Sequence, residues 1–279
     1  MAILLAAFCA VTYGLADYCG GRASRSVAST IVAFVGQAVS LLLVGAGVFL
    51  LGTPLASGHD LWWGAAAGAA GGIALVVFYR ALSAGAMTVV APITAVVSAA
   101  LPVVVGLSLG ERPSVTALIG MVVACLAVAL VSGAIGSRHQ HTSLAVIALA
   151  VIAGVGFGFI FVAFSRTADD SGLWPLAAYR VASLLIGAVI VVATRPGRGA
   201  IRSVIWLVVA SGILDMAANL FYLEASHRGL LTVVSVISSM YPVTTVCLAF
   251  GLDHERVSKT QAVGLAFAAT ALALVSLGS

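Results

Sequence analysis

Ten apolar segments, each about as long as a bilayer-spanning helix, follow one another along this chain with short polar links between them. Backbone groups inside a bilayer must be hydrogen-bonded within the protein, so such segments fold as helices. Only 8% of the residues are charged, against about a quarter in a typical soluble domain. The sequence therefore predicts an all-α integral membrane protein with ten transmembrane helices. The expected spans are 2–20, 28–51, 61–82, 86–109, 114–135, 143–164, 173–194, 203–224, 230–252 and 257–277.

The two halves of the chain resemble each other. A shift of 144 positions aligns Gly85–Val90 with Gly229–Val234 and Glu111–Ser114 with Glu255–Ser258. Each half then holds five spans, and an odd number inserts the second half upside down relative to the first. We therefore expect two inverted five-helix repeats, residues 1–135 and 143–279, which could rock about a shared central site. Glu111 and Glu255, each beside an arginine, are interpreted as loop anchors or helix caps.

The positive charges predict an orientation but no nucleic-acid partner. The net charge of +4 comes from cations that are scattered singly between apolar runs rather than gathered in a patch. Loops on the side of the termini carry three of them, and loops on the opposite side carry nine. By the positive-inside rule this distribution places the termini outside the cytoplasm. The three are Arg112, Arg166 and Arg228, and the nine are Arg22, Arg25, Arg80, Arg138, Arg195, Arg198, Arg202, Arg256 and Lys259.

Charged and polar residues inside the spans are costly in lipid and therefore mark candidate sites. Asp215, Asn219 and Tyr222 follow an i, i+4, i+7 pattern, which makes one polar stripe that should face the interior of the bundle. Arg180, in the seventh span, needs a counter-ion, for which Asp215 and Asp17 are the candidates. Arg180 would serve either as half of a structural ion pair or as a contact for a substrate anion.

Asp17 has two interpretations, because it lies near the end of the first span. It either lines a central cavity or pairs with Arg22 or Arg25 at the membrane surface. Asp17, Asp215 and Glu224 are the candidates for proton coupling. Hydroxyl and aromatic residues complete the expected substrate cavity: Tyr13, Tyr79, Thr94, Ser98, Ser238 and Tyr241. Pro92, Pro102 and Pro242 each remove a backbone donor, so we expect helix kinks that line the same cavity.

Small residues predict close helix packing, and the sequence carries no signature of an enzyme. Gly64, Gly68 and Gly72 form a small-residue face in the third span, which could pack within a monomer or join two chains in a homodimer. The chain lacks a dinucleotide fingerprint, a P-loop, an HExxH motif and a paired acidic motif. We therefore expect no catalytic activity, no cofactor and no metal site.

Several short motifs recur in the same order in both halves. Tyr13-Gly14 is matched by Phe157-Gly158, and Tyr79-Arg80-Ala81-Leu82 by Tyr222-Leu223-Glu224-Ala225. A stretch from Tyr241-Pro242 to Glu255-Arg256 closes the second half, with Ser98 to Glu111-Arg112 in the first. With Arg180 early in the seventh span, this pattern resembles the drug/metabolite transporter superfamily, specifically ten-helix proteins with two EamA-type domains. The sequence departs from the family at Ser98, where a proline is expected, and at the link between spans two and three, which has no Lys or Arg.

The resemblance implies a function and an orientation. It implies a secondary transporter that moves a small organic metabolite, an amino acid-like compound or a drug across the cytoplasmic (plasma) membrane by alternating access. It also implies that both termini lie in the cytoplasm, against the count of loop charges. Two other functions remain open: a membrane scaffold or sensor that transports nothing, and an integral-membrane enzyme that modifies lipids.

Overall fold

The structure is a computed structural model that describes residues 1–84, 87–131, 143–197, 201–253 and 258–278, and all its regular elements in these ranges are α-helices. Eight helical stretches in these ranges are long and apolar enough to cross a membrane, and parts of α4 and α5 form two shorter apolar helices. This confirms an all-helical, multi-pass membrane protein. The helices are α1 (Ala2–Ala23), α2 (Ser29–Leu51), α3 (Gly58–Ala84), α4 (Met87–Ser108), α5 (Val115–Val131), α6 (Leu144–Phe164), α7 (Trp174–Thr194), α8 (Ile201–Ser226), α9 (Leu231–Ser238), α10 (Tyr241–Asp253) and α11 (Lys259–Leu277).

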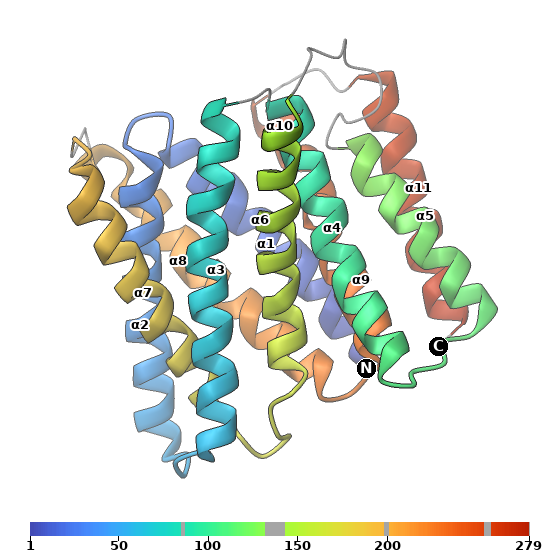
Figure 1. The fold of residues 1–279 in the computed structure, drawn as a ribbon, viewed down its shortest axis with the longest axis horizontal. Coiled ribbons are helices and arrows are strands. Elements are labelled where there is room, and N and C mark those ends of the chain that lie inside the picture. The colour runs from blue at the N-terminus through green and yellow to red at the C-terminus, as the bar shows by residue number, and fades with distance from the viewer. Residues whose placement is uncertain (85–86, 132–142, 198–200, 254–257, 279) are drawn as a thin grey trace.

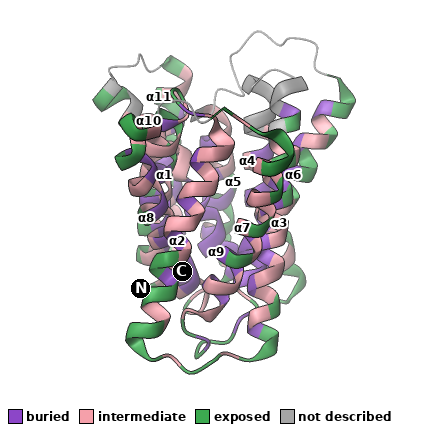
Figure 2. Ribbon diagram, turned by 90° about the vertical axis from the view of Figure 1, so that its left-hand side faces the viewer, coloured by how far each residue is buried: buried purple, intermediate pink, exposed green. Residues whose placement is uncertain are grey.

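The helices stand side by side and alternate in direction, so that both termini lie at the same end of the bundle (Figure 1). We call this the termini end. The contacts between the two halves are reciprocal: α1 packs on α8 as α6 packs on α3, and α2 packs on α8 as α7 packs on α3. The pair α5–α11 stands at one side of the bundle (Figure 1). Buried residues line the helix faces that point into the bundle (Figure 2).

The glycine face of α3 packs against α7. A Cβ atom at Gly64 would lie 2.2 Å from the carbonyl oxygen of Pro175, and one at Gly68 would lie 2.2 Å from that of Tyr179. Only glycine allows the two backbones to come this close, as small-residue faces do in membranes. Of the two possibilities for this face, the structure shows packing within the chain, so these glycines are not free for a homodimer contact.

One expected span is interrupted. The stretch Leu231–Leu252 contains two helices, because the chain leaves the helical pattern at Ser239 and Met240 between α9 and α10. Pro242, which cannot donate to the preceding turn, lies directly after this break. Pro102 is buried within α4, which continues past it as one helix, and the side chain of Pro92 lies outside the described residues.

Candidate substrate site: a polar layer beneath an open hollow

Polar side chains from three helices form a layer inside the bundle. The hydroxyl of Tyr13 on α1 donates to Oδ1 of Asn219 on α8, at 2.8 Å. The amide of Asn219 donates to the backbone oxygen of Asp215, one turn away, at 2.7 Å. The carboxylate of Asp215 in turn meets Arg180 of α7. The predicted i, i+4 spacing therefore brings Asp215 and Asn219 to the same interior layer, together with Tyr13 and Arg180.

Arg180 is held almost completely inside the protein. Its side chain is 1% exposed, and its Nη2 lies 2.6 Å from Oδ2 of Asp215. Its guanidinium carbon lies 4.7 Å from the ring centre of Tyr179, where a cation is favoured by the aromatic face. Nε has no hydrogen-bond partner among the described residues. Of the two counter-ions that the sequence offered, the structure pairs Arg180 with Asp215.

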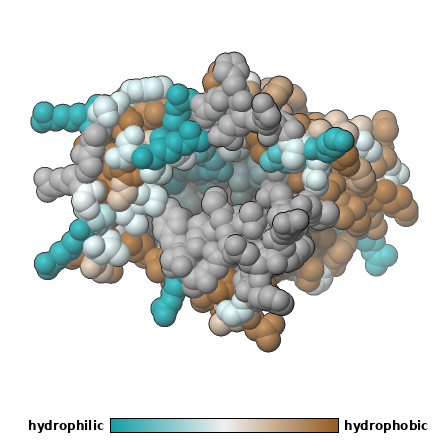
Figure 3. All heavy atoms as spheres, turned by 90° about the horizontal axis from the view of Figure 1, so that it is seen from above, coloured by the Kyte–Doolittle hydropathy of each residue, from teal (hydrophilic) through white to brown (hydrophobic). Residues whose placement is uncertain are grey.

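Above this layer the bundle is hollow. Figure 3 views the end opposite the termini and shows a depression between the helices with hydrophilic atoms at depth. Asp17 of α1 is exposed, and its carboxylate lies within electrostatic range of the Asp215 carboxylate and of the Tyr241 hydroxyl. It makes no hydrogen bond or ion pair with any residue that the structure describes, Arg22 and Arg25 included. The pairing with Arg22 or Arg25 is therefore not seen, and a place on the cavity wall stays a prediction.

The position of Asp17 on α1 supports this assignment. Leu4, Phe8 and Val11 form an exposed apolar stripe of the kind that faces lipid. Asp17 continues the opposite stripe, in which Ala6 and Ala10 are buried. A residue that is exposed on the inward stripe is exposed to an internal space, because the outward stripe already accounts for the lipid.

Below the polar layer, toward the termini end, the bundle is sealed by aromatic and aliphatic side chains. Tyr222 is fully buried, and its hydroxyl donates to the backbone oxygen of Phe161 at 3.1 Å. The Tyr222 ring lies 4.5 Å from that of Phe161, and Phe164 packs edge-on against Tyr179. All eight residues of α9 are buried beside them. The stripe predicted through Tyr222 therefore differs along α8: the side chain of Asp215 is partly exposed, whereas those of Asn219 and Tyr222 are fully buried.

Polar contacts between loops close the termini end. The carboxylate of Glu111, in the α4–α5 loop, accepts hydrogen bonds from the backbone N–H of Leu231 at 2.6 Å and of Thr232 at 2.9 Å. It therefore caps the start of α9, where Leu230, the N-cap residue, supplies no side-chain cap. Glu111 is thus a helix cap, one of the two roles that we expected. Glu255 lies outside the described residues.

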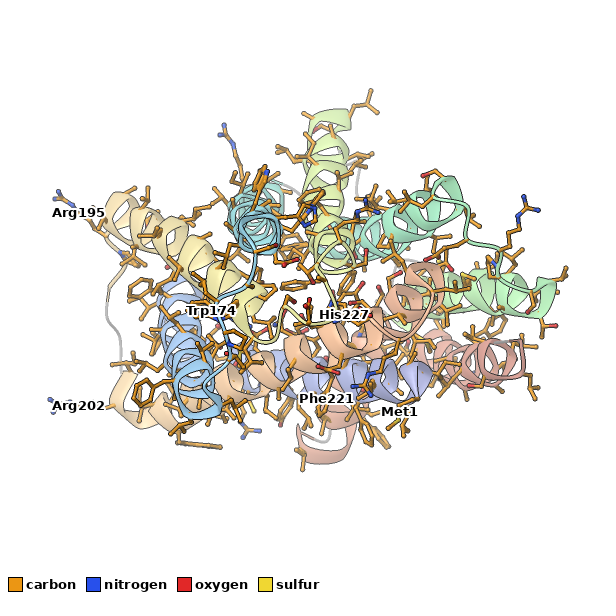
Figure 4. All side chains as sticks on the ribbon, turned by 90° about the horizontal axis from the view of Figure 1, so that it is seen from below. Met1, Trp174, Arg195, Arg202, Phe221 and His227 are labelled. Carbon is orange, nitrogen blue, oxygen red and sulfur yellow. The ribbon has the colours of Figure 1, made fainter. Side chains whose placement is uncertain are left out.

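The α6–α7 loop adds a second set of contacts at this end. The backbone N–H of Ala168 donates to Asp60 at 2.8 Å, and Thr167 lies 3.0 Å from Nε2 of His227. Seen from the termini end, Trp174 and His227 lie over the bundle, whereas Arg195 and Arg202 project from its edge (Figure 4). Sequence reasoning missed Asp60, since an acid at the start of an apolar segment looks like any surface residue.

The remaining predicted residues are spread more widely. Thr94 donates to the backbone oxygen of Ala150 at 3.1 Å and so ties α4 to α6, whereas Ser98 bonds its own helix. Ser238 is buried at the end of α9. The ring of Tyr241 lies 6.1 Å from that of Tyr13, beside the polar layer. The side chain of Tyr79 lies outside the described residues.

Glu224 lies apart from the other candidates. Its Oε2 is 2.6 Å from Nη2 of Arg228, one turn later on α8, and both side chains are largely exposed. It is therefore a surface ion pair at the termini end, and the structure gives no support to Glu224 as a proton-coupling residue. Tyr179, by contrast, was not among the expected residues, although it flanks the buried Arg180 directly in sequence and packs against it.

Comparisons with known proteins identify a similar fold and a related family. No curated protein matches the sequence. One solved crystal structure, described only as that of a protein, has the same fold: the TM-score is 0.80 at 19% identity, over 99% of this chain and 96% of the other. Residues 144–277 match the EamA-like transporter family. The resemblance seen in the sequence is confirmed: the second half of this multi-pass membrane protein is an EamA-like transporter family domain.

Proposed function

We propose that this protein is a secondary transporter that moves a small organic molecule across the cytoplasmic membrane by alternating access. Two observations support the proposal: the hollow at the end opposite the termini (Figure 3), and the polar layer of Arg180, Asp215, Asn219 and Tyr13, in which Asp215 and Tyr13 are partly exposed. A solute could enter this hollow from one side and meet polar groups near mid-membrane, while the floor below blocks its passage. A permanently open channel would lack such a floor.

The reciprocal packing of the two halves supports an inverted-repeat mechanism. Each half contributes the same kinds of helix contact to the other, as expected of residues 1–135 and 143–279 if they are related by a two-fold axis in the membrane plane. A structure closed at one end then has a counterpart of similar energy that is closed at the other. We propose that the chain alternates between these two arrangements, with the polar layer as the shared site.

The proposed orientation follows the family resemblance, with both termini in the cytoplasm and the hollow open to the outside. The described cations Arg22, Arg25, Arg80, Arg195, Arg202 and Lys259 then lie near the outer surface, against the positive-inside rule. A C-terminal tag tests this proposal. In intact cells the tag should resist external protease and become cleavable only after permeabilisation. Cleavage in intact cells would reverse the orientation.

Coupling to protons is proposed through Asp17 or Asp215, the two carboxylates at the hollow. Asp215 is compensated by Arg180, whereas Asp17 is exposed and has no compensating cation among the described residues. Exchange of one solute for another would need no titrating group. An imposed pH gradient distinguishes the two mechanisms, because it accelerates only a proton-coupled carrier.

The direct test is counterflow in proteoliposomes. Purified protein would first be screened by thermal shift against amino acids, nucleosides and cationic drugs, and hits would then be loaded inside vesicles with labelled solute outside. A carrier gives transient, saturable accumulation of label that disappears in protein-free vesicles. Ligands that bind without any counterflow would contradict the proposal and leave a scaffold or sensor.

A further inference from the structure

The charges at the hollow do not balance, and the imbalance indicates what the site binds. Asp17 lies within electrostatic range of Asp215 on α8, which is paired with Arg180 on α7, and of Tyr241 on α10, while Tyr13 lies one turn before it on the same face of α1. Arg180 and Asp215 form a pair at 2.6 Å and cancel each other. Asp17 is then one negative charge that no described residue compensates.

The cations near the mouth do not neutralise Asp17. Arg22 lies on the exposed stripe of α1, together with Tyr18, and its Nη1 donates to the Tyr18 hydroxyl at 2.8 Å. Arg25 lies beyond the end of α1 and is exposed. Neither arginine forms an ion pair with Asp17, which makes none with any residue that the structure describes.

The same arrangement disfavours an anion. Arg180 is the cation that a carboxylate or phosphate would seek, but it is 1% exposed and already holds Asp215. An anion would have to displace Asp215 and leave that carboxylate near Asp17, as a second uncompensated negative charge. A zwitterion would meet the same obstacle with its carboxylate end.

Aromatic groups beside Asp17 suit the body of an organic cation. The rings of Tyr13 and Tyr241 are 6.1 Å apart and tilted by 59°, and both side chains are partly exposed. Aromatic faces attract cations and also provide apolar contact. A carboxylate next to two such rings can accept hydrogen bonds from an ammonium group while the rings contact the carbon skeleton.

We propose that the substrate of this site is a monovalent organic amine, with its ammonium group paired to Asp17 and its apolar body against Tyr13 and Tyr241. This inference rests on the proposed transport function and adds the substrate class. It assigns Asp17 the role of counter-ion, and it assigns the Arg180–Asp215 pair the role of excluding anions and zwitterions.

The test uses four probes with the same phenyl group and different charge: phenethylamine, 2-phenylethanol, phenylalanine and 3-phenylpropionate. Binding to the purified protein is measured by calorimetry, and flux by counterflow in proteoliposomes. The amine should bind and exchange, with the other three at least tenfold weaker. In Asp17→Asn the affinity for the amine should fall about 10- to 100-fold, the effect of losing one charged hydrogen-bonded contact. Asp17→Glu should recover part of it.

The matched control is Glu224→Gln, which removes an exposed carboxylate at the termini end and should leave amine affinity unchanged. Preference for phenylalanine or phenylpropionate, full affinity in Asp17→Asn, or no binding of the amine would each overturn the substrate assignment. A different result would contradict only the transport proposal: the amine binds to the wild type and Asp17→Asn lowers its affinity, but no probe shows counterflow.

Discussion

Replacing Glu111 by glutamine weakens the contact that holds the start of α9 at the closed end. In the wild type both carboxylate oxygens accept a backbone N–H, from Leu231 and from Thr232. Glutamine offers one oxygen and one NH2 group, so one N–H loses its acceptor and faces a donor instead. Gly106 packs here as well, because a Cβ at this position would lie 2.5 Å from Oε2 of Glu111. The site therefore has little room to rearrange.

The size of the effect follows from the two bonds. A hydrogen bond to a charged group contributes about 1.5–3 kcal/mol. Glutamine should retain one weaker bond, so we expect a loss of about 1–3 kcal/mol from the state closed at the termini end. Every 1.4 kcal/mol is tenfold in an equilibrium, which makes opening at this end about 10- to 100-fold more frequent.

Cys9 is a natural reporter for this opening. It is fully buried in the lower part of α1, beside Ser238 at the end of α9. With Cys19, Cys125 and Cys247 replaced by serine or alanine, a membrane-impermeant maleimide added on the termini side should label Cys9 slowly in the wild-type background. Labelling should be at least tenfold faster in Glu111→Gln.

Two results would refute this reasoning. Equal labelling rates in both proteins would mean that Glu111 does not control closure. Equal acceleration in Glu224→Gln, whose ion pair lies exposed at the same end, would mean that any loss of charge there loosens the bundle. Gly68→Ala, which should lose a similar free energy at the α3–α7 contact, separates local opening from general destabilisation, because it should leave the labelling of Cys9 slow.

Asp215→Asn leaves Arg180 buried without a counter-ion, so we expect it to abolish transport and to cost about 3 kcal/mol of stability, measured by a melting curve in detergent. The double variant Arg180→Gln/Asp215→Asn should recover part of this stability. If the losses from the two single variants simply add up, the two residues are not coupled and the prediction is wrong. Gly68→Ala places a Cβ 2.2 Å from the Tyr179 oxygen, so it should lower stability by about 1–3 kcal/mol, whereas Gly45→Ala, with no atom within 4 Å, should be neutral or stabilising in the same melting experiment. Glu255 lies outside the described residues, but the repeat aligns it with Glu111, so we expect it to stabilise the state that is closed at the opposite end and open at the termini end. Glu255→Gln should therefore slow the labelling of Cys9. Faster labelling would contradict equivalent roles for the two glutamates.

The sequence was sufficient for the membrane spans, because crossing a bilayer requires about 20 predominantly apolar residues, but it did not predict the break between α9 and α10. It was also sufficient for the faces of α8, since Asp215 and Asn219 could satisfy their polar groups only inside the bundle. Because a charge inside the membrane needs a counter-ion, the sequence also limited the partner of Arg180 to Asp215 or Asp17. Choosing between them required the positions of α1 and α8 relative to α7, which depend on packing between distant segments.

Other parts of the site had no local signal. Asp60 and Thr167 act through loops whose approach depends on the whole bundle. The stripe is partly exposed at Asp215 and fully buried at Tyr222 because the bundle is closed at the termini end. The spacing of polar residues along the sequence does not indicate which end is closed. Tyr222 shows this most clearly, because its spacing matches that of Asn219 while its hydroxyl bonds the backbone of α6.

The most direct test of alternating access compares two cysteines, each in its own variant, during turnover. Asp17→Cys reports access from the hollow, and it receives solute at about a hundredfold higher concentration because it lacks the proposed counter-ion. Cys9, in a variant with Asp17 intact, reports access from the termini end. Without solute, the cysteine at position 17 should be labelled quickly from the hollow side, and Cys9 should be protected. A transported solute should slow the first reaction and accelerate the second, because the two ends open in turn. Transport during which Cys9 stays protected, or simultaneous fast labelling at both positions, would contradict the account.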